Sequence, residues 1–196
     1  SLSGTPNGSE QLAVVPIDNS IFDINGTASS TSQSNNTVNL FEKVLPTISS
    51  TALAADNSTI TATFSEAVFK SRSASGTGFA GNGDLEVSDF VLSMSGGVAT
   101  LGSATPTSVS KSSNAYTLGI NYIGLPNGSE VITVIPAQDA IYDNTGNIAS
   151  TTQSNNTKTF NSEKIRIAKS LEFETGYAQF LSLLKRDADT YIAAFM

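Results

Sequence analysis

Short runs of alternating apolar and polar residues recur along the middle of the chain. Because successive side chains of a strand point to opposite faces of a sheet, this period of two predicts strands with one buried face. Turn-forming stretches such as "GNGD", "SGG", "LPNG" and "DNTGN" separate the runs. The pattern predicts an all-β protein built as a two-sheet antiparallel sandwich. The apolar positions are Ile60, Ala62 and Phe64; Phe90, Leu92 and Met94; Tyr116, Leu118, Ile120 and Tyr122; and Ile132 and Val134.

A longer pattern is an internal repeat. Residues 6–40 align with residues 126–160 when the chain is moved along itself by 120 positions, and about half of the aligned residues are identical. We therefore predict a complete repeat over residues 45–161, called the complete repeat, after the C-terminal half of a preceding repeat over residues 1–44, called the half repeat. The phrase "STTQSNNTKTF" (150–160), which copies "STSQSNNTVNL" (30–40), is predicted to be the last turn and strand of a unit.

The half repeat raises a question of completion. Half a sandwich exposes its core-facing side and its strand edges, so another segment is expected to cover it. We expect the chain to be a piece of a longer protein.

Two stretches of the complete repeat depart from the strand pattern. In "PAQDAIYD" (136–143), Pro136 suits the first position of a single helical turn that places Ile141 in the core. The glycine-rich stretch "GTGFAGNG" (76–83) is predicted to form a long mobile connection, the kind of exposed loop on which binding surfaces are built.

The C-terminal segment, residues 162–196, has a different pattern. Residues 164–174, "KIRIAKSLEFE", alternate as one more strand. From Tyr177 to Phe195 the apolar residues follow the spacing of an amphipathic α-helix. Such a helix needs a partner for its aromatic face. It is predicted to pack on the sandwich or on a following module, and the alternatives are self-association with other copies and binding to a membrane surface.

Composition narrows the chemistry. Ser and Thr are about a quarter of the residues and charged residues are only 14%, which favours hydroxyl-rich strands over salt-bridged helices. Cysteine, histidine and tryptophan are absent, so disulfides, thiolate metal sites and histidine bases are excluded. The net charge of −7 repels phosphate backbones, which argues against nucleic acid as a partner. No apolar run is long enough for a membrane span.

Four stretches together resemble a known family. They are "PTISSTALAADNSTITATFSEAV" (46–68), "DLEVSDFVLSMSGG" (84–97), "YTLGI" (116–120) and "VITVIPAQDAIYDNTGNIA" (131–149). Their order and spacing resemble the bacterial Ig-like repeats of S-layer proteins and large adhesins. The resemblance implies Ig-like antiparallel β-sandwich repeats and an extracellular or cell-surface location. The first copy departs from it, since "DINGT" (23–27) stands where the second copy has "DNTGN" (143–147).

These observations lead to a hypothesis for function. We expect a non-enzymatic extracellular structural or adhesion repeat module. Its expected partners are other copies of itself, neighbouring repeats and a surface glycan. One form of this hypothesis is a filament subunit assembled by strand complementation, with residues 164–174 as the donor strand.

Acidic side chains supply the candidate sites. A pair of carboxylates can hydrolyse a glycosidic bond, but the dense acidic cluster around Glu66 lacks a tryptophan platform, so catalysis is not expected. No cofactor is expected except calcium, for which oxygen ligands on loops are suitable. The calcium candidates are Glu66, Asp84, Asp89, Asp143 and Asn147.

Two interpretations of these candidates stay open. In one, Asp143 only builds an Asx-type turn whose carboxylate accepts backbone N–H groups. In the other, the chain is a calcium-assisted ligand-binding or polysaccharide-binding accessory module of a larger secreted protein.

Overall fold

The computed structural model describes residues 2–75, 78–163, 182–185 and 191–194. Over these residues the chain consists of antiparallel strands, turns and one 3-10 helix, η1 (Val87–Asp89), so the predicted all-β class is confirmed. None of the described residues forms a helix that is long and apolar enough to span a membrane.

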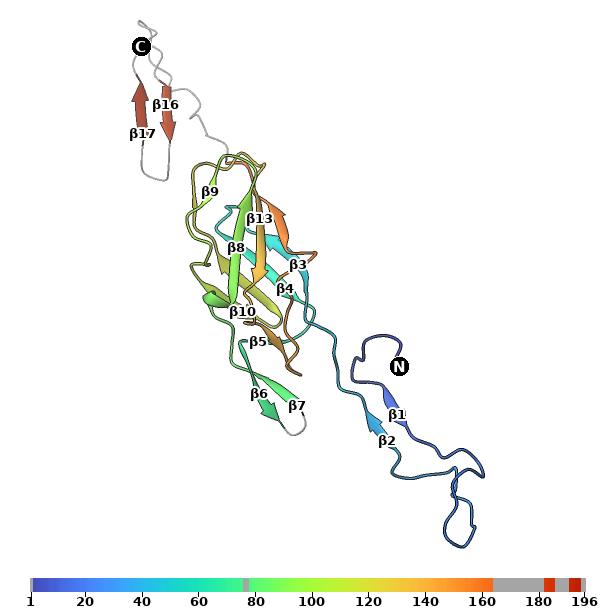
Figure 1. Ribbon diagram of the computed structural model, residues 1–196. Helices are drawn as coiled ribbons and strands as arrows, with labels where there is room; N and C mark the ends of the chain where they lie inside the picture. The colour runs from blue at the N-terminus through green and yellow to red at the C-terminus, as the bar shows by residue number, and fades with distance from the viewer. Residues whose placement is uncertain (1, 76–77, 164–181, 186–190, 195–196) are drawn as a thin grey trace, which may run out of the picture.

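Two antiparallel sheets form the body of the complete repeat (Figure 1). One has the strand order β10-β11-β4-β3 and the other the order β15-β13-β8. The strands of the first are β3 (Ile48–Leu53), β4 (Thr59–Phe64), β10 (Val109–Ser112) and β11 (Ala115–Gly119). Those of the second are β8 (Phe90–Ser95), β13 (Val131–Pro136) and β15 (Thr157–Thr159).

The core takes one apolar side chain from every second position of the central strands, as the alternation predicts. The rings of Phe64, Phe90 and Tyr116 form its largest group, with centroids 5.9 to 6.5 Å apart. The hydroxyl of Tyr116 donates a hydrogen bond to the carbonyl of Val68 at 3.1 Å, so the buried ring keeps a polar partner. The other fully buried side chains of the central strands β4, β8, β11 and β13 are Ile60, Ala62, Leu92, Leu118, Ile132 and Val134.

The repeated phrase joins the two sheets. Gln153 accepts a hydrogen bond from the backbone N–H of Ile48 at 2.7 Å, and the hydroxyl of Thr51 lies 3.1 Å from the carbonyl of Thr157. Asn156 donates its side-chain amide to the carbonyl of Val134 at 2.7 Å. The phrase is therefore the last turn and strand of the unit, as predicted.

Short strand pairs close the ends of the sandwich. They are β5 (Val68–Phe69) with β14 (Tyr142–Asp143), β9 (Thr100–Leu101) with β12 (Tyr122–Ile123), and β6 (Ser71–Ser75) with β7 (Gly78–Asn82). The β6–β7 hairpin extends from the lower end of the sandwich in Figure 1.

The hairpin corrects the prediction of a long mobile connection over residues 76–83. Residues 78–82 form β7, paired with β6 from Ser71↔Asn82 to Ser75↔Gly78. A Cβ at Gly81 would collide with the ring of Phe69, so this glycine lets the strand pass closely over the ring. Gly81, one of the glycines that suggested a loop, instead permits close packing.

The helical turn predicted over residues 136–143 is also absent. Pro136 is the last residue of β13, and a turn closed by Ala140 N–H to Ala137 carbonyl (3.3 Å) follows. Pro136 still pairs with Phe90 at the end of the ladder. The expectation for Ile141 is confirmed, because this side chain is fully buried.

The half repeat has the same backbone structure as residues 126–163. Its strands β1 (Gln11–Ala13) and β2 (Thr37–Asn39) pair in the register of β13 and β15, and the Phe22↔Ala28 bridge matches Tyr142↔Ile148. Asn36 donates to the carbonyl of Val14 at 2.8 Å, as Asn156 does to that of Val134. The two copies therefore share strand register and the same side-chain amide contact.

The described part of the C-terminal segment is a hairpin. Strands β16 (Ser182–Lys185) and β17 (Tyr191–Ala194) pair antiparallel, so the predicted helix is wrong at these residues. Its apolar residues come in short runs that suit strand as well as helix, and aspartates, which favour turns, lie between the runs. The predicted strand over residues 164–174 lies outside the described residues, as does the rest of the helix.

A buried carboxylate holds two loops against β13. Glu130, fully buried, accepts hydrogen bonds from the backbone N–H groups of Val98 (2.8 Å), Ala99 (3.1 Å), Asn127 (3.0 Å) and Gly128 (3.0 Å). Burial by itself raises the pKa of the Glu130 carboxyl, but these donors outweigh it and lower the pKa to about 2. The ionised side chain is therefore part of the folded structure.

The low pKa of Glu130 predicts acid sensitivity. A lowered pKa contributes stability that is full above the ordinary value of 4.5 and is lost as the pH falls toward about 2. We expect Glu130→Gln to lower the melting temperature by several degrees at neutral pH and to flatten the loss of stability between those two values. Denaturant unfolding across this pH range measures both effects.

The matched control is Glu10→Gln, which changes the exposed equivalent carboxylate in the half repeat. It should leave the curve of the complete repeat unchanged. Equal pH dependence in the wild type and in Glu130→Gln would contradict the assignment.

Candidate functional site

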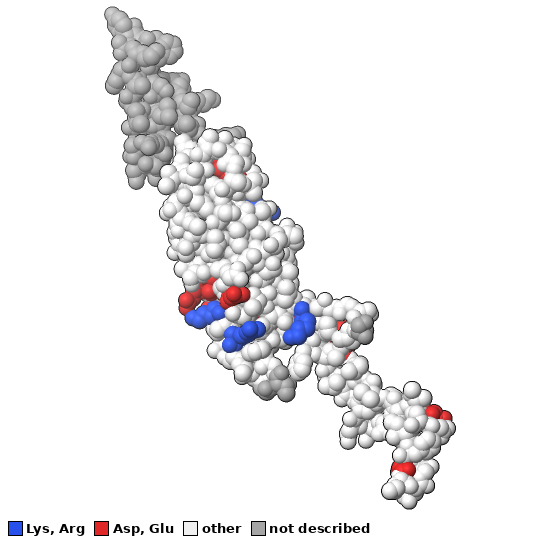
Figure 2. Space-filling view, viewed as in Figure 1, with Lys and Arg blue, Asp and Glu red and all other residues white. Residues whose placement is uncertain are grey.

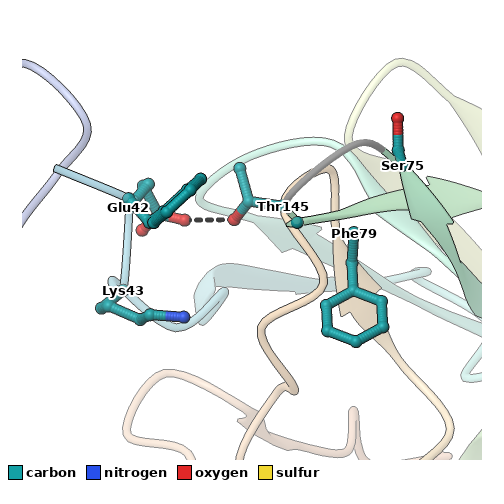
Figure 3. Close-up of a pocket in the computed structure, with 7 residues that line it drawn as sticks. Glu42, Lys43, Ser75, Phe79 and Thr145 are labelled. Carbon is teal, nitrogen blue, oxygen red and sulfur yellow. Dashed lines mark hydrogen bonds between the residues drawn. The ribbon is translucent and has the colours of Figure 1, made fainter. Parts of the chain in front are cut away.

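The linker between the two repeats is held against the complete repeat. Glu42 accepts hydrogen bonds from the side-chain amide of Asn147 and from the hydroxyl of Thr145, each at 2.5 Å. Figure 3 shows the Glu42 carboxylate pointing at Thr145. These contacts join residues that are separated by 103 and 105 positions in the sequence. We call the group of Glu42, Glu66, Asp143, Thr145 and Asn147 the junction cluster.

Asp143 organises the turn that faces the linker. Its buried carboxylate accepts the backbone N–H groups of Thr145 and Asn147, both at 2.8 Å, and the side-chain amide of Asn147, also at 2.8 Å. Gly146 has a φ of +85°, which a glycine adopts without strain. The Asx-type turn that was one of the two interpretations is therefore present, and it presents Asn147 to Glu42.

Glu66 adds a third carboxylate to the cluster. Burial, and then the negative charges of Asp143 and Glu42, raise the pKa of the Glu66 carboxyl above its ordinary value. Such like-charge crowding favours a proton or a cation. Among the described residues, however, no three or more acidic side chains are arranged to hold a metal ion. The calcium hypothesis for Glu66, Asp143 and Asn147 stays a prediction.

The other two calcium candidates have different contacts. Asp84 forms an ion pair with Lys111 at 2.9 Å. Asp89 lies in η1, and its carboxylate accepts the backbone N–H of Glu86 at 2.7 Å. Burial raises the pKa of Asp89. The structure therefore groups Glu66, Asp143 and Asn147 and uses Asp84 and Asp89 in contacts away from them.

An open pocket of about 280 Å³ lies beside the junction cluster. Lys43 of the linker lies on one side and Phe79 of β7 on another (Figure 3), and Phe41 of the linker also lines the pocket. The guanidinium of Arg72 lies 4.5 Å from the centre of the Phe79 ring and donates to the carbonyl of Gly146 at 2.8 Å, so the ring has a fixed support. The remaining lining residues are Glu42, Ser75, Gly78 and Thr145.

Charge is sparse on the surface. Figure 2 shows a group of basic and acidic side chains toward the end of the sandwich near the β6–β7 hairpin and a few acidic side chains elsewhere, with most of the viewed face uncharged. Two ion pairs, Lys70 with Glu86 and Lys111 with Asp84, account for four charged side chains of the complete repeat.

Two side chains that hold loops in place are not predicted by the sequence patterns. Glu42 lies in "FEKVLP", which was treated only as a linker, and its partner Asn147 was considered only as a calcium ligand. Glu130 ends the phrase "PNGSE", which occurs at both 6–10 and 126–130. The available signal was a glutamate at the same place in both copies, directly before an apolar strand.

Comparison with models of protein families, with functionally described proteins and with solved structures gives no match to this chain.

The raised pKa of Glu66 predicts a stabilising substitution. A carboxyl whose pKa is raised by folding loses stability as the pH rises through 4.5 and above, because the folded state then holds an unfavourable charge. We expect Glu66→Gln to unfold at a higher denaturant concentration than the wild type at neutral pH. The difference should disappear in acid, where the wild-type side chain is neutral.

Urea titrations at acidic and neutral pH measure this difference. Asp18→Asn, which neutralises an exposed carboxyl of the half repeat, is the control and should not change stability at either pH. Glu66→Gln less stable than the wild type at neutral pH would contradict the prediction.

Proposed function

We propose that this chain is a non-enzymatic Ig-like repeat module of an extracellular or cell-surface protein, with a structural or adhesive role. The observation that supports it most directly is the duplicated backbone structure: two segments 120 residues apart have the same strand register and the same side-chain amide contact. Repeated units that each bury their own core and meet their neighbours at short linkers are the usual way to build long protein arrays.

The junction cluster suits a module in an array. Glu42 of the linker accepts two hydrogen bonds from the turn at residues 143–147, and that turn is fixed by the buried Asp143. A linker held at a fixed point limits the angle between units, so a chain of such units stays extended. Neighbouring repeats are therefore its first expected partners.

The positions of the acidic side chains support a structural rather than a catalytic role. Glu130 binds four backbone N–H groups, Asp143 shapes a turn, and Asp84 pairs with Lys111. A glycosidase needs two carboxylates that flank a cleft and are free to exchange protons. These carboxylates instead act in fold and turn contacts.

A filament is one form of this proposal. Strand β1 of the half repeat pairs with β2 on one edge, and in the described residues its other edge has no strand partner. Open edges are where donated strands add. The proposed donor, residues 164–174, lies outside the described residues. Native mass in solution with and without residues 164–196 measures whether these residues link molecules.

A second candidate is calcium-assisted binding of a ligand or polysaccharide. The raised pKa of Glu66 beside Asp143 and Glu42 favours it, since a divalent cation would relieve the same crowding that favours a proton. The adjacent pocket carries two phenylalanine rings, which can pack on a sugar face.

The proposed location predicts exposure on intact cells. Protease added to intact source cells should release peptides from the complete repeat, with cleavage in the exposed linker around Phe41. Mass spectrometry of the supernatant identifies the peptides, and a cytoplasmic marker protein that stays uncut is the control. Protection of the repeat until the cells are lysed would rule out an extracellular role.

The second candidate predicts a response to calcium. Calcium at about 1 mM, within the range used by extracellular modules, should raise the melting temperature of the wild type. Glu66→Gln should lose most of that rise, whereas Asp84→Asn should keep it, because Asp84 lies against Lys111. No shift in the wild type together with no signal on a glycan panel would eliminate this candidate.

A further inference from the structure

The half repeat exposes the face that its counterpart buries. Leu12 and Val14 are 47% and 69% exposed, whereas Ile132 and Val134 at the equivalent positions of β13 are at 0%. Ile21 is 55% exposed and its equivalent Ile141 is fully buried. A contiguous apolar face of this kind on a soluble protein marks a surface that something else covers.

In the complete repeat the equivalent face belongs to the core that the two sheets share, and the edge of β13 beside that face is occupied by β8. There β13 lies between β15 and β8, and the β8 residues Met94, Leu92 and Phe90 pair with Ile132, Val134 and Pro136 in turn. Strand β1 has the counterpart of β15, which is β2, but in the described residues it has no counterpart of β8. The register of β1 with β2 is already that of β13 with β15, so the open edge has the geometry that β8 would need.

A second and independent observation concerns Glu10, the equivalent of Glu130. Glu130 accepts N–H groups from its own turn and also from Val98 and Ala99, which follow the Gly-Gly turn after β8. Among the described residues Glu10 accepts only the N–H of Asn7, at 3.0 Å. A carboxylate in this position lacks the backbone donors that its counterpart receives from the β8 loop.

We propose that β1 and Glu10 form a docking site for a polypeptide segment with the chemistry of residues 90–99. That segment is a strand with apolar residues at alternate positions, followed by a Gly-Gly turn whose backbone N–H groups reach Glu10. This inference rests on the proposed role of the chain as a repeat module, because the occupant is the front half of another repeat of the same kind.

The chain's own β8 does not supply this segment. It pairs with β13 over six residue pairs, and its Phe90 and Leu92 side chains are buried in the core of the complete repeat. Residues 164–174, the donor strand in the filament form of the proposal, have alternating apolar positions for pairing with β1 but no glycine pair after them, so they would leave Glu10 without these backbone donors.

A synthetic peptide with the sequence of residues 84–101 tests the proposal. Added to the full-length, nitrogen-15-labelled chain, it should shift the backbone amide signals of residues 10–14 and slow their hydrogen exchange. The signals of residues 131–136 should not change. A peptide with Gly97→Ala is the matched control, since a Cβ at this glycine would collide with the Glu130 carboxylate and hence with Glu10 at the equivalent place.

Variants of the chain distinguish binding at this site from nonspecific binding of the peptide. Val14→Asp on the proposed face should abolish binding, and Glu10→Gln should weaken it by about tenfold, the effect of losing one charged hydrogen-bond acceptor. Val38→Asp should leave binding unchanged, because Val38 of β2 aligns with the exposed Lys158 on the outer face of β15.

Each contrary result has a clear meaning. No shift with the wild-type peptide, an equal shift with the Gly97→Ala peptide, or shifts only at residues 131–136 would overturn the proposal. Concentration-dependent dimers of the chain that block the peptide would also overturn it, by assigning the face to a second copy. The protease experiment on intact cells is independent, so the site can fail while the proposed function stands.

Discussion

The contact on which the complete repeat depends is the one between the Glu130 carboxylate and the backbone N–H groups of two loops. A buried charge is tolerated only when it is well hydrogen bonded, and here four amides from residues 98, 99, 127 and 128 supply the bonds. These amides lie at the end of β8 and at the start of β13, so the carboxylate sets the register of the central ladder. Once β8 and β13 are aligned, their alternate side chains meet those of β4 and β11 in the core.

The strands of the fold could be predicted from sequence because their pattern is strong. In β4 and β13 every second residue is apolar and buried, and in β8 Phe90 and Leu92 follow the same pattern with Met94 half-buried. The buried face of each strand can therefore be recognised in the sequence. The β6–β7 hairpin could not be predicted in this way, because glycines that permit close packing on Phe69 look the same in sequence as glycines of a loop. The C-terminal hairpin was not predicted for another reason. Its short apolar runs fit the period of a strand and that of a helix, and only pairing between the runs distinguishes the two.

The candidate site was only partly accessible to sequence. Asp143 and Asn147 were predicted as calcium candidates, with an Asx-type turn as the alternative for Asp143, and the structure contains that turn. Their meeting with Glu42 joins residues more than 100 positions apart and depends on the path of the linker, which no local pattern encodes. The apolar face of the half repeat shows the complementary case. Its backbone has the register of the second copy, while burial of the same face requires partners from elsewhere.

The difference between Asn147 and Thr27 has a consequence for mechanics. Asn147 holds the linker that enters its own repeat through an amide that reaches Glu42, whereas the first copy has Thr27 at this position, whose shorter side chain carries no amide. In an array of the proposed kind, a repeat with threonine at this position would lack the amide contact to its linker. Its joint would then bend more easily than the joint held by Asn147 and Glu42.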